Sequence, residues 1–192
     1  MTTQTDILDM FRSSGALLDG HFRLTSGKHS GQYFQCARVL QYPSHASTLC
    51  HAIADHYRPS NISLVIAPAI GGIVVGQETG RQLGVRTIFA ERENGVMSMR
   101  RGFEIFPEDR ILICEDVITT GGSVKEVMEL IQPMGGTLVG IGSIVDRSNG
   151  KADFGIPYFS VMTLDAIAWQ PDDCPLCKTN LPLVKPGSRV FK

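Results

Sequence analysis

The sequence has 192 residues, of which 43% are hydrophobic, and its mean hydropathy is +0.04. This length is sufficient for one α/β domain with a hydrophobic core and a small accessory lobe. The 18 Lys and Arg residues nearly balance the 19 Asp and Glu residues, which gives a formal charge of −1. This balance excludes the overall positive field that draws proteins onto nucleic acid or anionic lipid, so any phosphate site must be local.

Two further features of the composition bear on the cellular compartment. No apolar run approaches the ~20 residues that span a bilayer, and the first residues, MTTQTDILDMF, lack the basic and apolar regions of a secretory signal. The five cysteines are an odd number, and Cys114 lies in a predicted buried strand, which argues against a disulfide framework. We therefore expect a cytoplasmic protein.

The first third of the chain predicts two helices and an irregular lobe. Ile7, Met10 and Phe11 have helical spacing within residues 6–14, and Gly15 follows as a stop signal. Residues 20–42 mix aromatic residues with Gly, Ser and Lys, which is typical of a hairpin-like irregular lobe. A second amphipathic helix is expected after Pro43.

From residue 62 onward, short apolar runs alternate with helical stretches. Strands this apolar on both faces are typical of a parallel sheet that is covered by helices. The expected strands are residues 62–68, 85–90, 110–114, 137–146 and 156–164. Helices are expected at residues 72–83, ending at Gly84, and at residues 121–134.

The stretch ILICEDVITTGGS, residues 111–123, is the most informative in the chain. Ligands of open parallel sheets bind beyond the carboxyl ends of the strands. The turn from Thr119 to Ser123 offers backbone N–H groups and hydroxyls at the start of a helix, where a phosphate is favoured. It is neither a Walker loop nor a GxGxxG fingerprint, because the required Lys and glycine spacing are missing.

Glu115 and Asp116 immediately precede this turn. Two carboxylates would repel a polyphosphate, but they accept hydrogen bonds from the hydroxyls of a vicinal diol. A phosphate beside a 2,3-diol describes a ribose 5-phosphate. The alternative interpretation of the two acids alone is a solvated turn or a helix-cap pair.

The same stretch resembles the phosphoribosyl pyrophosphate signature of the type I phosphoribosyltransferases. Residues 15–36 and the strand end Val145-Asp146-Arg147 resemble the branch of that family that acts on orotate. The resemblance runs from residue 6 to about residue 170. It implies a parallel sheet flanked by helices, with a small N-terminal hood lobe mainly at residues 15–42, in a single domain of residues 1–192 with an irregular tail at about 171–192.

The resemblance also implies roles for individual residues. Glu115 and Asp116 match the acids that hold the ribose hydroxyls, and Arg147 matches the arginine that receives the orotate carboxylate. Thr119 is also expected near the base. In the hood, Lys28 is expected to contact pyrophosphate, and either Tyr33 or Phe34 is expected to contact the base. The alternative for the aromatic residue is a place in the hydrophobic core. The 5-phosphate loop matches Thr119, Thr120, Gly121, Gly122 and Ser123, and Val117 and Ile118 before it are also expected to bind phosphoribosyl pyrophosphate. The pyrophosphate loop matches Ala67, Pro68, Ala69, Ile70, Gly71 and Gly72.

Some positions depart from the family pattern. Thr25 and Gly71 stand where many members have lysines. The mobile loop of the family corresponds to residues 91–105, in which Arg92, Arg100 and Arg101 are the only cations. We expect these arginines to stabilise the pyrophosphate and the loop to close over the site, with Gly95 and Gly102 as candidate hinges.

The chemistry implied by the resemblance is transfer of the phosphoribosyl group from phosphoribosyl pyrophosphate to orotate, giving orotidine 5′-monophosphate and pyrophosphate in pyrimidine synthesis. The transition state resembles an oxocarbenium ion, so positioning and electrostatics reduce the barrier. Mg²⁺ is expected to bind through the substrate rather than directly to the protein. A homodimer that shares a loop across its interface is also implied, with no nucleic acid or membrane partner.

Alternatives remain open at this point. A phosphoribosyltransferase for a purine base would have the same phosphate turn but no need of Arg147. A non-catalytic regulator that senses phosphoribosyl pyrophosphate would keep the fold and add a basic surface.

Cys174 and Cys177 form a C-x2-C pair, which is at best half of a zinc site. We interpret this pair as an incidental part of the tail, with a metal site or a redox pair as the alternatives.

Overall fold

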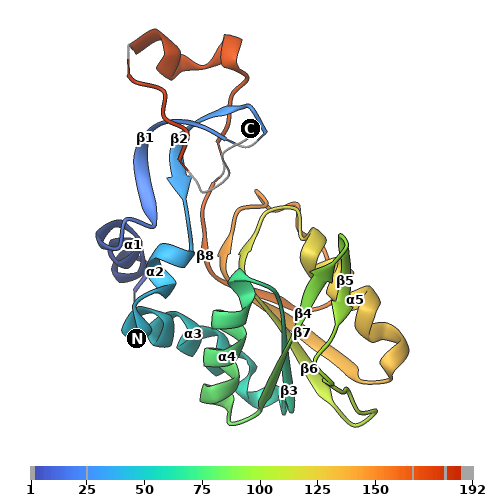
Figure 1. Ribbon diagram of the computed structural model, residues 1–192. Helices are drawn as coiled ribbons and strands as arrows, with labels where there is room; N and C mark the ends of the chain where they lie inside the picture. Colours follow the sequence, from blue (N-terminus) through green and yellow to red (C-terminus); the bar gives the residue numbers. More distant parts are fainter. Residues whose placement is uncertain (1–2, 25, 166, 180, 187–192) are drawn as a thin grey trace.

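The structure of the protein is a computed structural model that describes residues 3–24, 26–165, 167–179 and 181–186. It contains a six-stranded sheet with helices on both faces and a separate two-stranded hairpin (Figure 1). The helices are α1 (Gln4–Ser13), α2 (Ala37–Leu40), α3 (Pro43–Tyr57), α4 (Gly71–Leu83) and α5 (Gly122–Ile131). The strands are β1 (Leu17–Arg23), β2 (His29–Phe34), β3 (Leu64–Pro68), β4 (Arg86–Glu93), β5 (Val96–Met99), β6 (Arg110–Ile118), β7 (Thr137–Asp146) and β8 (Tyr158–Thr163).

The large sheet has the order β5-β4-β3-β6-β7-β8. All neighbouring strands are parallel except β4 and β5, which are antiparallel. The predicted α/β class and all five predicted strands of this sheet are therefore confirmed, and Gly84 ends α4 in the left-handed conformation as expected. β6 extends to Ile118, four residues beyond the predicted end, so Glu115 and Asp116 lie in the strand and not in the turn.

The apolar residues of the strands divide between the two faces of the sheet. In β6, Leu112 and Cys114 belong to one core cluster together with residues of α1 and α3. Ile111 and Ile113 point to the opposite face and pack with Val124 and its neighbours on α5. This alternation explains why the strands are continuous apolar runs, because helices cover both faces.

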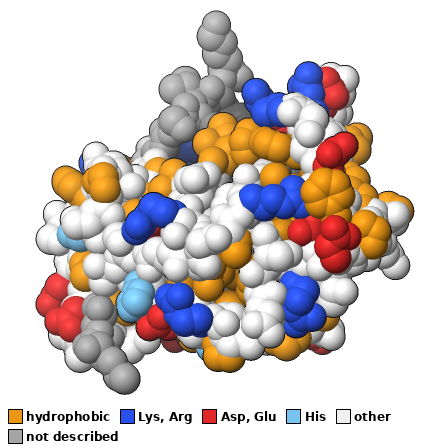
Figure 2. Space-filling view, turned by 90° about the horizontal axis from the view of Figure 1, so that it is seen from below, with side chains coloured by type: hydrophobic (Ala, Val, Ile, Leu, Met, Phe, Trp, Pro, Cys, Tyr) orange, Lys and Arg blue, Asp and Glu red, His pale blue; other side chains and the backbone are white. Residues whose placement is uncertain are grey.

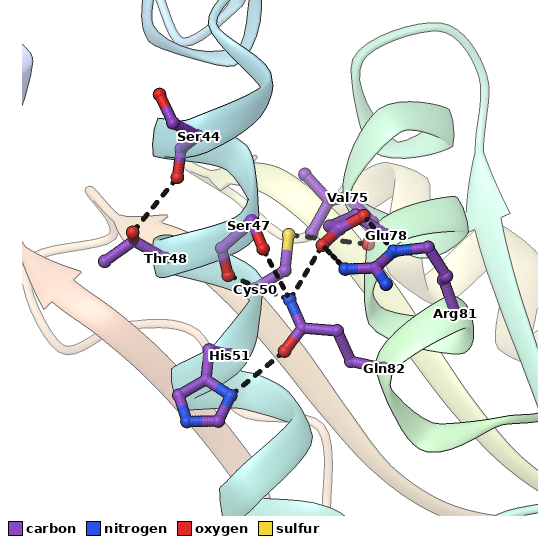
Figure 3. Close-up of polar contacts among 9 residues, drawn as sticks. All are labelled: Ser44, Ser47, Thr48, Cys50, His51, Val75, Glu78, Arg81 and Gln82. Carbon is purple, nitrogen blue, oxygen red and sulfur yellow. Dashed lines mark hydrogen bonds and ion pairs between the residues drawn. The ribbon is translucent and has the colours of Figure 1, made fainter.

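Helices α3 and α4 are joined by a polar network as well as by apolar packing (Figure 3). Glu78 accepts two hydrogen bonds from Arg81, at 2.7 and 2.8 Å, and one from Gln82 at 2.8 Å. Gln82 also donates to the backbone carbonyl of Ser47 on α3 at 2.8 Å. These bonds, led by those from Arg81, lower the pKa of Glu78 to about 2.

We expect Glu78→Gln to destabilise the fold by about 1 kcal/mol at pH 7, the typical net value of such hydrogen bonds. Because the folded pKa is depressed, the stabilisation is present above about pH 4.5 and is lost as the pH falls toward about 2. Urea unfolding of both proteins between pH 3 and pH 7 measures the effect. Glu129→Gln, at an exposed position of α5, is the control; an equal loss there, or a loss independent of pH, would contradict the assignment.

The hairpin of β1 and β2 lies in the segment predicted as the hood and is called the hood below, and the described part of the tail lies against it (Figure 1). His29 pairs with Trp169, and Phe22 pairs with Val184. The tail contains two short 3-10 turns, η3 (Pro171–Asp173) and η4 (Pro175–Thr179). The predicted irregular tail therefore has a defined position on the hood.

One face of the molecule is mixed in charge. On the face that Figure 2 shows, Lys and Arg side chains alternate with Asp and Glu side chains and with hydrophobic ones. The balance of charge seen in the composition therefore also holds locally on this face. Separately, no helix among the described residues is both long and apolar enough to span a membrane.

Candidate active site

Two loops meet where the direction of the chain through the sheet reverses. After β3 the chain passes through α4 to β4 on one side, and after β6 it passes through α5 to β7 on the other. The neighbouring strands β3 and β6 therefore flank a topological switch point, where α/β proteins bind their ligands. Residues 69–70 and 119–121 form the loops at this crevice.

The turn after β6 lines a half-open cavity of about 60 Å³, several times the space that one water needs. Gly121 precedes α5 with φ at 75°, a conformation that favours glycine. The first N–H groups of the ten-residue helix α5 have no carbonyl partners within the helix, and the N–H of Gly122 donates to the Thr120 hydroxyl at 3.4 Å. This end of the helix favours an anion. The cavity is lined by Glu115, Val117, Ile118, Thr119, Thr120, Gly121, Gly122, Ser123 and Val124. The structure thus brings the predicted phosphate residues together.

Glu115 lines this cavity, and the carboxylate of Asp116 lies against Gly71 at the start of α4. Glu115 is only 8% exposed, and its Oε1 accepts a hydrogen bond from the Asp116 backbone N–H at 3.0 Å. Burial, together with the neighbouring Asp116 carboxylate, raises the pKa of Glu115 well above its usual range. Burial also raises the pKa of Asp116. The fold therefore holds two carboxyl groups in a position that disfavours their charge, as expected of groups that await a ligand.

We expect Glu115→Gln to stabilise the free protein by about 1 kcal/mol at pH 7, in the range typical when strain at a functional site is relieved. Because its pKa is raised in the folded protein, Glu115 binds its proton more tightly in the native state than in the unfolded state. Wild-type stability therefore falls as the pH rises above about 4.5 toward the raised folded pKa. The difference between the two proteins should vanish below about pH 4.5, the ordinary pKa of Glu. Chemical unfolding at pH 4 and pH 7 tests this, and a variant less stable than wild type at pH 7 would contradict it.

Gly71 and Gly72 start α4 directly against the two acids. A Cβ atom added at Gly71 would collide with the Asp116 carboxylate, and one at Gly72 would lie 3.0 Å from Glu115 Oε1. A side chain at position 71 would therefore require the Asp116 carboxylate to move. Of the other residues of the predicted pyrophosphate loop, Ile70 is 85% exposed beside the crevice, and Ala69 donates its N–H to the Ala90 carbonyl.

Arg147 follows β7 at the same edge of the sheet. Its backbone N–H donates to the carbonyl of Ile118, at 2.7 Å, which places it beside the phosphate turn. The side chain is partly buried, and its Nε atom is buried without a hydrogen-bond partner. Burial lowers the pKa of the guanidinium. An anion with two oxygens would satisfy this group.

The three arginines expected to cover the pyrophosphate are not brought to the acids. Residues 86–99 form the β4–β5 hairpin, which the sequence does not predict. Arg92 pairs with Glu126 of α5 at 2.6 Å, Arg100 with Glu93 at 3.2 Å, and Arg101 with Glu91 at 3.1 Å. Gly95 and Gly102 both have positive φ, which suits turns. Glu91, Glu93 and Glu126 hold these arginines along the edge of the sheet.

The hood residues are divided. Lys28 is exposed at the turn between β1 and β2, whereas Phe34 is buried in the core with its ring centroid 5.1 Å from that of Phe11. The structure therefore places Phe34 in the core, the alternative given above, and not against a base. Tyr33 packs on Phe22. Thr25, the other departure from the family pattern, lies outside the described residues.

Phe154 is a site residue that the sequence does not indicate. A Cβ atom at Gly121 would lie 2.7 Å from its ring, so Phe154 packs directly against the phosphate turn. The ring also lies 5.9 Å from the Lys125 ammonium. Its position in a loop 33 residues after Gly121 carries no local pattern that could have revealed the contact.

Comparisons with known proteins agree with this geometry. The profile of the phosphoribosyl transferase domain matches residues 38–177. An orotate phosphoribosyltransferase of Chlorobaculum parvum is 59% identical over 97% of this chain and 97% of its own. One of Pelotomaculum thermopropionicum is 54% identical over 97% of this chain and 98% of its own.

A solved structure shows the same fold. The crystal structure of orotate phosphoribosyltransferase from Aeropyrum pernix aligns with a TM-score of 0.69 at 26% identity, covering 82% of this chain and 93% of that one. The switch-point crevice, the glycine turn and the full-length similarity lead to one assignment. This chain belongs to the phosphoribosyltransferase family, in its orotate phosphoribosyltransferase branch.

Proposed function

We propose that this protein transfers the 5-phosphoribosyl group from phosphoribosyl pyrophosphate to orotate, releasing pyrophosphate and forming orotidine 5′-monophosphate. The observation that carries the choice of base is Arg147, whose buried Nε has no partner and whose backbone bonds to the end of β6. A carboxylate-bearing pyrimidine satisfies such a guanidinium, and adenine does not. The names of the relatives support the same choice.

The sugar phosphate occupies the switch-point crevice. The N–H groups and hydroxyls of the turn from Thr119 to Ser123 hold the 5-phosphate, and Glu115 and Asp116 accept hydrogen bonds from the ribose diol. Pyrophosphate leaves toward residues 69–72, at the amino end of α4, where the helix dipole stabilises negative charge. Each well-placed donor to the developing charge contributes about 3 kcal/mol.

Magnesium binding is part of the proposal. The oxygen donors present, the carboxylates of Glu115 and Asp116, fit a small hard cation that keeps several waters and binds mainly through the substrate. A Mg²⁺ ion bound in this way would supply positive charge to the leaving pyrophosphate. Glu115 and Asp116 would contribute at one remove, by accepting hydrogen bonds from the diol.

We further propose a homodimer in which the hairpin of residues 86–99 and the following residues reach a neighbouring site. Arg92, Arg100 and Arg101 lie along the sheet edge, paired with acids. These surface ion pairs are weak enough to exchange for a polyphosphate. A cytoplasmic location is likewise proposed, and it suits the free thiols of Cys36, Cys50 and Cys114.

The direct test mixes the protein with phosphoribosyl pyrophosphate, Mg²⁺ and orotate and follows the loss of orotate absorbance. Turnover of orotate without turnover of adenine supports the proposal. Turnover of adenine alone would assign the protein to a purine base instead. Binding of phosphoribosyl pyrophosphate without turnover of either base would indicate a sensor.

A further inference from the structure

Four side chains with metal-binding atoms converge where the tail meets the hood. His21 and His29 come from β1 and β2, and Cys174 and Cys177 come from the tail. Their donor atoms all lie within 4.8 Å of one another. The sequence separates the two pairs by more than 140 residues, so the C-x2-C pair looks incomplete until the chain is folded.

The distances match those of a tetrahedral zinc centre. Bonds of about 2.3 Å to sulfur and about 2.0–2.1 Å to nitrogen place S and N about 3.5 Å apart and two N atoms about 3.3 Å apart in a tetrahedron. Here His21 Nε2 lies 3.5 Å from Cys174 Sγ and 3.7 Å from Cys177 Sγ. His29 Nδ1 lies 3.3 Å from Cys177 Sγ and 3.1 Å from His21 Nε2.

The histidine tautomer also suits a metal. His21 Nδ1 lies 3.0 Å from the carbonyl oxygen of Leu181, which can only accept a hydrogen bond. Nδ1 of His21 must therefore carry the proton, and Nε2 presents its lone pair to the cluster. This arrangement, in which a ligating histidine donates its other N–H to a carbonyl, is typical of metal sites.

The cluster joins the hairpin to the tail, in addition to a few hydrogen bonds between the two segments. The hairpin is only two strands wide, and an isolated hairpin is marginally stable in water. The tail is attached by backbone bonds of Trp169 to His29 and of Val184 to His21 and Arg23. His21, His29 and Cys174 are nevertheless buried, at 3%, 6% and 1% exposed, so their polar atoms need partners.

We propose that His21, His29, Cys174 and Cys177 bind one Zn²⁺ ion that fastens the tail to the hood. Two sulfur and two nitrogen donors favour zinc over magnesium or calcium. With four protein ligands no position is left for water or substrate, so the site is structural. Binding releases the thiol protons. The proposal does not depend on the activity proposed above.

The test measures zinc in the purified full-length protein by mass spectrometry of the metal. We expect about one zinc per chain in the wild type and, in Cys177→Ala and His29→Gln, less than roughly a tenth of that. His51→Gln and Cys50→Ala are the matched controls, because these residues lie on α3, outside the cluster. The controls should retain the wild-type zinc content.

A second measurement covers variants that fail to fold. Wild-type protein reconstituted with Co²⁺ should show the intense visible bands of a tetrahedral ion and a thiolate charge-transfer band, both lost on adding Zn²⁺. Wild type that contains no zinc, and that gives only the weak spectrum of octahedral Co²⁺, would overturn the proposal. So would a mass two hydrogens below that of the reduced chain, because a Cys174–Cys177 disulfide removes both sulfur ligands.

Discussion

Replacing Glu115 by Gln and Asp116 by Asn together is expected to lower kcat/KM for phosphoribosyl pyrophosphate by about 10²–10⁴-fold. Hydrogen bonds to charged acceptors contribute about 1.5–3 kcal/mol each, and the double variant exchanges two carboxylates for neutral amides of the same shape. The amides still accept hydrogen bonds, but they no longer carry the charge that strengthens bonds from the ribose hydroxyls. Steady-state kinetics with orotate held at saturation measures the loss.

The fold should survive this change, because burial disfavours the charged form of both carboxyl groups in the free protein. Burial raises the pKa of each, so neutral replacements remove a destabilising charge. Thermal unfolding of the double variant should therefore give a midpoint at or above that of wild type. Glu129→Gln is the kinetic control. Unchanged kcat/KM in the double variant would mean that the acids do not hold the diol.

The sheet and the phosphate turn could be predicted because their signals are local. Strands such as residues 137–146 are buried on both faces and are therefore continuous apolar runs. The turn from Thr119 to Gly122 needs hydroxyls, backbone N–H groups and a left-handed glycine, and all of these are visible in the letters. The ligand predicted for this turn, a ribose 5-phosphate, likewise rests on residues that are neighbours in the sequence.

The features that escaped prediction depend on segments that are distant in sequence. The strand β6 continues through Glu115 and Asp116 because β7 provides backbone partners as far as Asp146. Gly71 is placed by its contact with Asp116, 45 residues away. His21 and His29 face the Cys174 and Cys177 thiols only after the tail returns to the hood. Composition and spacing carry no information on such contacts.

The hairpin of residues 86–99 shows a different limit. Arg92, Arg100 and Arg101 are the cations of a segment with few apolar residues, which favours a loop on sequence grounds. In the structure, β5 adds to the edge of the sheet through β4, and Met97 is buried there. Tertiary pairing at a sheet edge overrides a weak local preference. The arginines are placed by that edge and by the acids Glu91, Glu93 and Glu126.

Arg147→Ala is expected to raise the KM for orotate by about 10²-fold or more, the effect of removing one partner of a buried charged pair. The KM for phosphoribosyl pyrophosphate should change by less than about threefold, because the sugar phosphate is held by other residues. The guanidinium of the free protein is already partly buried, which lowers its pKa. It therefore gains more from a carboxylate than a solvated arginine would.

Arg147→Lys separates charge from geometry in the same assay. Lysine keeps the positive charge but loses the planar pair of N–H donors that matches a carboxylate, so this variant should fall between wild type and Arg147→Ala. Orotate analogues without the carboxylate should bind wild type and Arg147→Ala equally weakly. If both substrates lost affinity to the same extent in Arg147→Ala, the arginine would be supporting the phosphate turn through its bond to Ile118 and would not be receiving the base.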